Sequence, residues 1–337
     1  MNPALTWIGA ARTRVGALFP GLIASVTVAA AATFLSQHYG APVMLFALLL
    51  GMAMNFLSQQ DSSRPGIELA SKHLLRVGVA LLGLRITFGQ IVGMGWFPVL
   101  LVVGSVVATI GVSYVAARLM GFKASFGVLS GGSVAICGAS AAMALSTVLP
   151  NHPLRERATL FTVIGVSALS TLAMVAYPML AQLLGLSEHQ TGIFLGATIH
   201  DVAQVVGAGY GVSQAAGDTA TVVKLLRVAM LMPVILTITL VTRRTRDPEA
   251  PKAVLMPWFV TAFGVLVLVG SLGWVPKPVQ ALGNDASRWA LVISISAIGM
   301  KTRLQELVTV GIRPILLMFG ETLFLASLVA GMLLFFG

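Results

Sequence analysis

Long apolar runs, separated by short polar stretches, fill almost the whole chain. About 20 consecutive apolar residues are needed to cross the hydrocarbon core of a bilayer. The runs predict eleven membrane-spanning helices, at residues 15–36, 42–57, 69–88, 96–117, 124–148, 158–184, 190–210, 220–242, 254–274, 287–302 and 312–336. Because the connecting stretches are short, the pattern predicts an all-α polytopic membrane protein that forms one integral domain over residues 1–337, with no separate soluble domain.

The composition agrees with this pattern. Hydrophobic residues make up 57% of the chain and charged residues only 9%, and the mean hydropathy of +0.93 lies far above that of soluble domains. The first apolar run is too long for the core of a secretory signal, so we interpret it as a retained helix. The single cysteine, Cys137, excludes an internal disulfide.

Basic residues collect on one side of the predicted helices, and short cytoplasmic loops retain such residues. With the N-terminus inside, the cytoplasmic side carries thirteen of them: Arg12, Arg14, Arg64, Lys72, Arg118, Lys123, Arg243, Arg244, Arg246, Lys252, Lys301, Arg303 and Arg313. The other side carries four: Arg155, Arg157, Lys277 and Arg288. The bias predicts a multi-pass membrane protein with its N-terminus cytoplasmic and its C-terminus on the opposite side of the membrane. The net charge of +10 therefore reflects topology and contact with anionic lipid, and no nucleic-acid partner is expected.

Two glycine-rich polar segments interrupt otherwise apolar spans, at residues 130–140 and 196–209. In lipid such interruptions are tolerated only where they are buried in protein or line a cavity. Unwinding of the first segment would direct backbone N–H groups at a solute, and the dipole of the following half-helix favours an anion. The predicted solute-binding residues here are Ser130, Gly131, Gly132, Ser133, Cys137, Gly138 and Ser140. The alternative is that small residues merely allow close helix packing.

The second polar segment places His200 and Asp201 at the middle of the membrane, where ionisable residues are costly and mark functional sites. Asp201 is a candidate to accept a proton or a sodium ion, and His200 a candidate to control proton coupling. Gln204 follows one turn later, so we expect it to share a helix face with His200 and to contact the solute. The alternative is an Asp–Arg or His–backbone pair that locks the helices together.

Buried cations outnumber buried acids within the predicted spans. Arg76, Arg227 and Lys224 lie inside helices, whereas Asp201 and Glu321 are the acids within them; Lys301 lies at a helix end. Two guanidinium groups suit bidentate capture of an oxyanion such as sulfate, sulfite or a sulfonate. The commoner explanation of such residues is that their long stems reach the interface. A sodium/proton antiporter needs clustered carboxylates, so the inventory favours an anionic substrate.

An internal repeat is indicated by Leu74-Leu75-Arg76-Val77 and Leu225-Leu226-Arg227-Val228, which lie five helices apart. An odd shift inverts the orientation, as transporter repeats with a site between them require. The register divides the chain into an extra N-terminal helix (1–37) and two repeats (42–184 and 190–337). It pairs the second helix with the seventh and the fifth with the tenth, and it adds Asn55, Ser294 and Ser296 to the predicted solute site. A competing match of Gly83-Leu84-Arg85 with Gly299-Met300-Lys301 implies a shift of seven helices.

Three segments carry a resemblance to a known family: residues 131–141, residues 196–208 with the motif Ile-His-Asp-Val-Ala-Gln, and residues 297–302. From about Leu45 onward the chain resembles the sulfate exporter family of bacterial inner-membrane proteins, the YeiH type. The resemblance implies a fold similar to that of the cation/proton antiporter and bile-acid symporter superfamily. That fold has inverted repeats, a panel domain and a core domain in which two interrupted helices cross, and the resemblance also implies a homodimer.

The sequence therefore predicts a secondary active transporter that moves a small anion by alternating access, with H⁺ or Na⁺ as a coupling ion. A core domain holding the fifth and tenth helices is expected to move against a panel domain. The alternatives are a cation/proton antiporter and a passive anion channel. An enzyme is not expected, because no metal-spaced His or Cys cluster is present and adjacent His200 and Asp201 point about 100° apart on a helix. No cofactor is expected.

Overall fold

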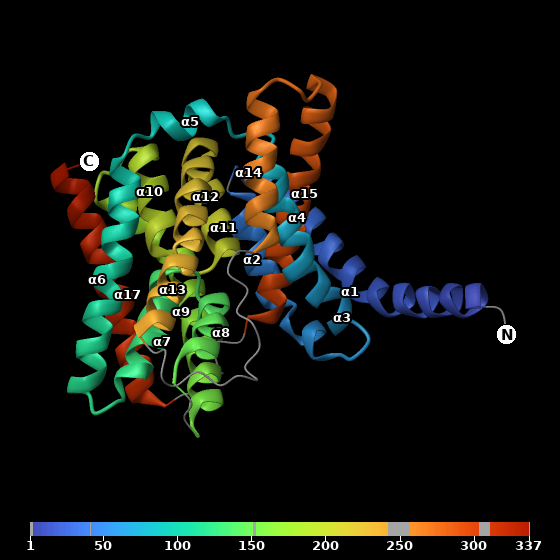
Figure 1. Ribbon diagram of the computed structural model, residues 1–337. Helices are drawn as coiled ribbons and strands as arrows, with labels where there is room; N and C mark the ends of the chain where they lie inside the picture. The colour runs from blue at the N-terminus through green and yellow to red at the C-terminus, as the bar shows by residue number, and fades with distance from the viewer. Residues whose placement is uncertain (1–2, 41, 151–152, 242–256, 303–310, 337) are drawn as a thin grey trace. The chain divides into compact units, whose positions relative to one another are not determined.

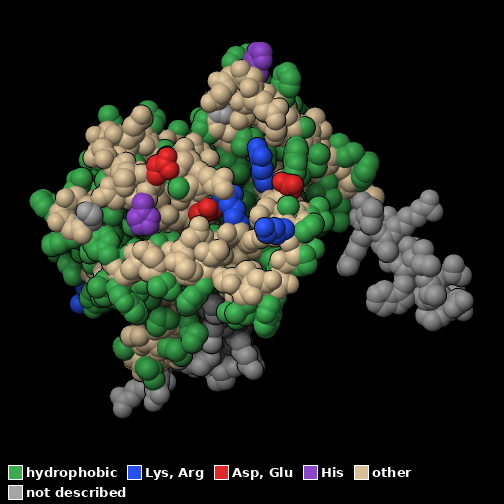
Figure 2. Space-filling view, turned by 90° about the horizontal axis from the view of Figure 1, so that it is seen from above, with side chains coloured by type: hydrophobic (Ala, Val, Ile, Leu, Met, Phe, Trp, Pro, Cys, Tyr) green, Lys and Arg blue, Asp and Glu red, His purple; other side chains and the backbone are tan. Residues whose placement is uncertain are grey.

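The computed structural model describes residues 3–40, 42–150, 153–241, 257–302 and 311–336 (Figure 1). These residues form helices and no strand, as the hydropathy pattern predicts. Five helices in the described part are long and apolar enough to cross a membrane, at 16–39, 97–119, 155–183, 214–241 and 312–336. Large apolar side chains also lie on the outside: Leu119, Leu183 and Phe335 are each more than 80% exposed. Figure 2 shows many such apolar side chains on one face. The described structure is therefore that of an all-α multi-pass membrane protein.

Several basic residues used for the orientation lie outside the described residues. They are Arg243, Arg244, Arg246, Lys252 and Arg303.

The chain forms two compact units. Unit 1 comprises residues 1–87 and 262–303, and unit 2 comprises residues 88–261 and 304–337. The helices of unit 1 are α1 (Pro3–Tyr39), α2 (Val43–Ala53), the 3₁₀ turn η1 (Asn55–Gln59), α3 (Arg64–Leu69), the π turn η2 (Ala70–Leu74), α4 (Leu75–Leu82), most of α14 (Trp258–Ser271) and α15 (Lys277–Lys301).

Unit 1 is held together by close approaches of helix backbones at glycines. A Cβ atom on Gly51 of α2 would lie 2.3 Å from the carbonyl oxygen of Ser296 on α15. Conversely, a Cβ on Gly299 of α15 would lie 2.4 Å from the carbonyl oxygen of Leu48 on α2. Both distances are shorter than any real Cβ contact, so only glycine fits at either position. Small residues of this kind let membrane helices pack backbone against backbone.

Asn55 begins the turn η1 and closes the C-terminal end of α15. Its Nδ2 donates to the carbonyl oxygens of Met300 at 2.6 Å and Thr302 at 3.1 Å. The last carbonyls of a helix have no partner within the helix, so this amide satisfies two of them. Asn55 therefore holds α15 to the end of α2.

We expect Asn55→Ala to lower the free energy of unfolding by about 1–2 kcal/mol, since two hydrogen bonds to the end of α15 are lost. Denaturation of the purified protein in detergent measures the change. Gln60→Ala is the matched control, because Gln60 is exposed five residues further along. An equal effect of both substitutions would contradict the capping role.

Unit 2 contains the remaining described helices. They are α5 (Phe88–Gly93), α6 (Phe97–Leu119), α7 (Ala124–Ala135), α8 (Ala139–Val148), α9 (Arg155–Leu183), α10 (Glu188–Thr198), α11 (Val202–Val212), α12 (Gln214–Ala229), α13 (Leu231–Val241) and α17 (Ile312–Phe336).

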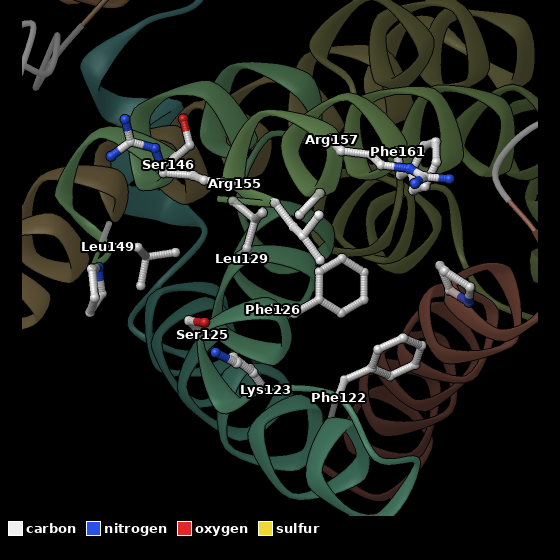
Figure 3. Close-up of a pocket in the computed structure, with 14 residues that line it drawn as sticks. Phe122, Lys123, Ser125, Phe126, Leu129, Ser146, Leu149, Arg155, Arg157 and Phe161 are labelled. Atoms are coloured by element: carbon white, nitrogen blue, oxygen red, sulfur yellow. The ribbon is translucent and has the colours of Figure 1, made fainter. Parts of the chain in front are cut away.

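Helices α7 and α8 form a hairpin that enters unit 2 and returns to the same end. A Cβ on Gly132 of α7 would lie 2.5 Å from Cδ1 of Leu145 on α8, so the two helices run side by side. Their outer ends also meet, because Lys123 before α7 and Leu149 and Arg155 after α8 line one pocket of about 300 Å³ (Figure 3). We call this the first hairpin, and its tip is formed by residues 136–138.

Helices α10 and α11 form a second hairpin against α12. A Cβ on Gly192, near the start of α10, would lie 2.8 Å from the carbonyl oxygen of Ala216. A Cβ on Gly209, near the end of α11, would lie 2.9 Å from Cα of Gly217. Both outer ends therefore lie at the first turn of α12. The tip of this second hairpin is formed by residues 199–201.

The two hairpins enter unit 2 from opposite ends. Helix α9 has 29 residues and is about 43 Å long at 1.5 Å per residue. It leaves the outer end of the first hairpin and is followed at Ser187 by the outer end of the second, where Ser187 and Gln190 form a capping box. In Figure 1, α10 and the α7–α8 pair accordingly lie toward opposite ends of α9.

This arrangement corrects two expectations. The fifth and seventh predicted spans, 124–148 and 190–210, are hairpins and not crossing helices, because each turns back at its glycine-rich interruption. The expectation that the fifth and tenth helices share one domain is also wrong. Helix α15, which contains the tenth span, is continuous over Lys277–Lys301 and belongs to unit 1, whereas the fifth belongs to unit 2. The five- and seven-helix repeat registers stay predictions.

Candidate functional site

The tips of the two hairpins meet inside unit 2. A Cβ on Gly138, at the first tip, would lie 3.6 Å from Cβ of His200, at the second. Gly138 has φ +62° and ψ −125°, a conformation that only glycine adopts readily, and it separates α7 from α8. The sequence interruptions therefore do form two unwound segments in contact with each other.

Arg227 of α12 is fully buried and binds the helix ends at the two tips. Its Nε donates to the carbonyl oxygen of Ala135 at 2.8 Å, and its Nη2 to that of Val134 at 2.8 Å. Its Nη1 donates to the carbonyl oxygens of Gly196 at 3.2 Å and Ile199 at 3.0 Å. One guanidinium thus joins the C-terminal end of α7 to that of α10.

Lys224 lies one turn before Arg227, on the same face of α12. It is also fully buried, and its Nζ donates to the carbonyl oxygens of Ile136 at 2.7 Å and Ile199 at 3.0 Å. The C-terminal end of a helix carries a partial negative charge. Lys224 and Arg227 therefore neutralise the two helix ends that stop in the middle of unit 2.

The structure consequently gives Arg227 a role different from the expected capture of an oxyanion, because its N–H groups are directed at backbone carbonyls. Arg76, its predicted symmetry mate, lies half-buried on α4 in unit 1 and is not part of this cluster. Sequence reasoning identified the right buried cation but the wrong partners, since backbone carbonyls carry no sequence signal.

His200 is fully buried at the second tip. Its Nδ1 lies 3.0 Å from the carbonyl oxygen of Val134, and its Nε2 lies 3.0 Å from Oγ1 of Thr322 on α17. A carbonyl accepts only, so Nδ1 of His200 carries a proton and donates to Val134. Oγ1 of Thr322 also donates to the carbonyl oxygen of Met318 at 2.8 Å, so Thr322 contacts both the ring and the backbone of its own helix. His200 therefore cross-links the two tips to α17, as the predicted His–backbone alternative describes. Thr322 itself was missed by the sequence analysis.

Asp201 caps the N-terminus of α11 by accepting from the backbone N–H of Ala203 at 2.8 Å, and its own N–H donates to Oγ of Ser170. Gln204, one turn later, donates to Oγ1 of Thr171 at 2.9 Å. The expectation that His200 and Gln204 share one helix face is wrong, because the helix is interrupted at 199–201.

The first turn of α8 is the accessible part of the first tip. Gly138 at the N-cap offers no side chain, so no side chain caps this helix, and Ser140 is exposed. The neighbouring predicted residues are enclosed: Ser133 donates to the carbonyl of Leu129 at 2.5 Å, and Cys137 is buried. Gly131 and Gly132 lie buried in α7, with Gly131 packed against Ser113 of α6. Ser130 contacts Glu321 instead of the tips.

The other predicted site residues belong to unit 1. Asn55 closes the end of α15, while Ser294 and Ser296 donate to carbonyls of their own helix, Ala290 at 2.6 Å and Val292 at 3.0 Å. These hydroxyls are therefore satisfied within α15. At the hairpin tips, α8 begins without an N-cap side chain, α11 begins with the cap of Asp201, and the ends of α7 and α10 are neutralised. This arrangement is suited to hold a small charged solute.

Comparison with known proteins gives consistent matches over most of the chain. Residues 20–318 match the family model described as conserved hypothetical protein 698. The chain is 56% identical to a UPF0324 membrane protein of Chlorobaculum tepidum, over 96% of this chain and 91% of the relative. It is 50% identical to the UPF0324 membrane protein TauZ of Paracoccus denitrificans, over 94% of this chain and 95% of the relative. None of the solved structures matches the chain.

Proposed function

We propose that this chain, which belongs to the UPF0324 family of membrane proteins, is a secondary active transporter of a small anion of the sulfate, sulfite or organosulfonate class. It works by alternating access in the bacterial inner membrane, with H⁺ or Na⁺ as the coupling ion, and as a homodimer. The solute is held at the hairpin tips of unit 2. A cation/proton antiporter and a passive anion channel are the alternatives.

The N-terminus of α8 carries this proposal. Its first N–H groups start inside unit 2, the N-cap residue Gly138 has no side chain to accept from them, and Ser140 is exposed beside them. The N-terminal end of a helix attracts anions through its free N–H groups and its dipole. Discontinuous helices whose N-termini face an anionic group are a recurring device of transporters.

The charges near the tips support an anion over a cation. The two helix C-termini, which would attract a cation, are already neutralised by Lys224 and Arg227. Asp201 is the carboxylate of the second tip, and it accepts a hydrogen bond from the helix that follows it. A cation/proton antiporter would need carboxylates free to bind its ion, which favours the anion carrier.

The hairpins also bring the proposed topology into better agreement with the positive-inside rule. Since the first hairpin returns to the side from which it enters, Arg155 and Arg157 lie on the same side as Lys123. With the N-terminus cytoplasmic, these two arginines join the positive cytoplasmic side, and of the basic residues counted above Lys277 and Arg288 stay opposite. The C-terminus stays periplasmic, because two hairpins replace two crossings.

Ligand-dependent thermal stability tests the substrate class. The detergent-purified chain is heated with sulfate, sulfite, thiosulfate, taurine, sulfoacetate or chloride, all with one common cation, and separately with sodium. A ligand at 100 times its Kd stabilises the folded state by about 2.7 kcal/mol. A rise in Tm with a sulfur oxyanion, followed by saturable counterflow of that anion in proteoliposomes, supports the proposal. A response to sodium alone favours the antiporter, and flux that does not saturate favours the channel.

A matched pair at Ser140 tests the position of the site. Ser140→Asp puts a carboxylate at the uncapped N-terminus of α8, so we expect anion affinity to fall about 10-fold or more while the dipole interaction stabilises the fold by about 0.3–1 kcal/mol. Ser140→Asn is similar in size but uncharged and should retain most of the affinity. The measurement is the anion-dependent Tm shift of each variant. Equal affinity of the two variants would move the site away from α8.

A further inference from the structure

A buried carboxyl group that the hairpin tips do not use lies elsewhere in unit 2. Glu321 of α17 is only 3% exposed. Its Oε1 contacts Oγ of Ser113 on α6 and lies 2.7 Å from Oγ of Ser130 on α7. Ser113 Oγ also lies 2.7 Å from the carbonyl oxygen of Gly127. Three helices thus bring a carboxyl, two hydroxyls and a carbonyl together in the interior.

The number of protons in this cluster decides the state of the carboxyl. Three close contacts need a proton each: Ser113 to Gly127, Ser113 to Glu321, and Ser130 to Glu321. The carbonyl of Gly127 accepts only, and two serines supply two protons. An ionised Glu321 would leave one contact between oxygens without a proton. A protonated Glu321 supplies the third, so that Glu321 donates to Ser113, Ser113 to Gly127, and Ser130 to Glu321.

The surroundings of Glu321 also favour the neutral acid. Helices α6, α7, α9 and α10 pack against α17, and within the described residues no basic side chain pairs with Glu321. His200 reaches Thr322, the residue that follows Glu321 in the chain, and contacts the carbonyl oxygen of Val134. Oε2 of Glu321 is buried and has no hydrogen-bond partner among the described residues. An ionised carboxylate in such a place is costly, whereas a neutral acid is tolerated.

We infer that Glu321 is held as a neutral carboxylic acid and carries the coupling proton of the transport cycle. The serines Ser113 and Ser130 position that proton, and it is bound in the state described here and released to water in another state. The coupling role rests on the proposed transport function, whereas the protonation of Glu321 does not. Glu321 thus replaces His200 and Asp201, the residues expected from the sequence, as the proposed carrier of the coupling proton. His200 and Asp201 make other contacts at the tips.

Infrared spectroscopy of the full chain tests the protonation without any substrate. The carbonyl stretch of a carboxylic acid is separate from the bands of a carboxylate, and a maltoside detergent has no ester carbonyl to obscure it. At neutral pH we expect this band in the unmodified protein and in Glu188→Gln, whose residue is exposed, and its loss in Glu321→Gln. Ser130→Ala should shift the band without removing it.

Three infrared results would overturn the inference. They are a missing band in the unmodified protein, a band that persists in Glu321→Gln, and a band that disappears on adding sodium. The last result would assign the site to Na⁺. Glutamine has the shape of the protonated acid, so Glu321→Gln is expected to fold. If this variant does not fold, the shift of the carbonyl band in Ser130→Ala tests the assignment instead.

Proteoliposomes test the coupling. With an internal pH indicator, a sulfate or sulfite gradient should move protons through the unmodified protein. Glu321→Gln should reduce proton movement to the background of empty liposomes while labelled anion still exchanges. If Glu321→Gln moves as many protons per anion as the unmodified protein, the coupling role is overturned. Absence of anion transport by the unmodified protein would instead refute the proposed function and, with it, the coupling, and the infrared result would stand on its own.

Discussion

Replacing Arg227 by methionine is expected to destabilise the protein by about 3–5 kcal/mol, the range found when one partner of a buried charged interaction is removed. The side chain is fully buried, and its four hydrogen bonds go to the carbonyls at the ends of α7 and α10. Without them, Ala135 and Gly196 lose the donor that satisfies their carbonyl oxygens, and two helix C-termini keep an uncompensated partial charge.

The measurement is the folded, monodisperse fraction in detergent as a function of temperature or denaturant. Arg76→Met is the matched control, because Arg76 stands in the same Leu-Leu-Arg-Val sequence but is only half-buried on α4. We expect the control to change stability by less than about 1 kcal/mol. Arg227→Lys keeps the charge and loses the planar fork, so it should fall between the two. Equal stability of the two methionine variants would show that Arg227 does not hold the tips.

Gly138→Ala is expected to cost about 1–3 kcal/mol of stability and to abolish anion-dependent stabilisation. The space around Gly138 is adequate, since an added Cβ would lie no closer than 3.6 Å to any neighbour. The cost arises from the backbone, because φ +62° with ψ −125° is unfavourable for every residue that carries a Cβ. Relief of that strain would move the start of α8 and the N–H groups proposed to hold the anion.

Gly104→Ala on α6 is the control, and it should increase the stability of the protein where Gly138→Ala lowers it. An added Cβ there meets nothing within 4 Å, and alanine in a helix is about 0.5–1 kcal/mol more favourable than glycine. Thermal denaturation with and without sulfite or sulfate compares the two variants. A Gly138→Ala protein as stable as Gly104→Ala would mean that the first tip does not need its left-handed bend.

The sequence was sufficient to predict a helical membrane protein and the places where two helices are interrupted, because apolar length and glycine-rich breaks are local properties. It did not predict the hairpins. A run such as 124–148 is long enough to cross a bilayer, and hydropathy is the same for a straight helix and for one that turns back. The signal that was available is the charge of Arg155 and Arg157, which the eleven-span topology placed on the wrong side for the positive-inside rule.

The candidate site was predicted in part for a similar reason. His200, Asp201 and Gly138 lie at the tips. They could be predicted because ionisable residues and glycine-rich breaks are conspicuous in an apolar sequence. Asn55 and Ser294 were added through a repeat register, and they instead satisfy carbonyls of α15. Ser113 and Thr322, which contact Glu321 and His200, are single hydroxyl residues in apolar helices and gave no signal before the helices were brought together.

The partners of Arg227 and Lys224 are backbone carbonyl oxygens, which every amino acid provides. Val134, Ala135 and Ile199 can therefore be replaced by other apolar residues without loss of the hydrogen bonds that join the two hairpins. Arg227 cannot be replaced in this way, because no other amino acid has the same set of N–H donors. A saturation library of unit 2 should accordingly tolerate apolar substitutions at the residues whose carbonyl oxygens accept these hydrogen bonds, and it should not tolerate substitution of Arg227. Apolar side chains beside the tips can thus change the shape of the solute site, while the hydrogen bonds that join the two hairpins are kept.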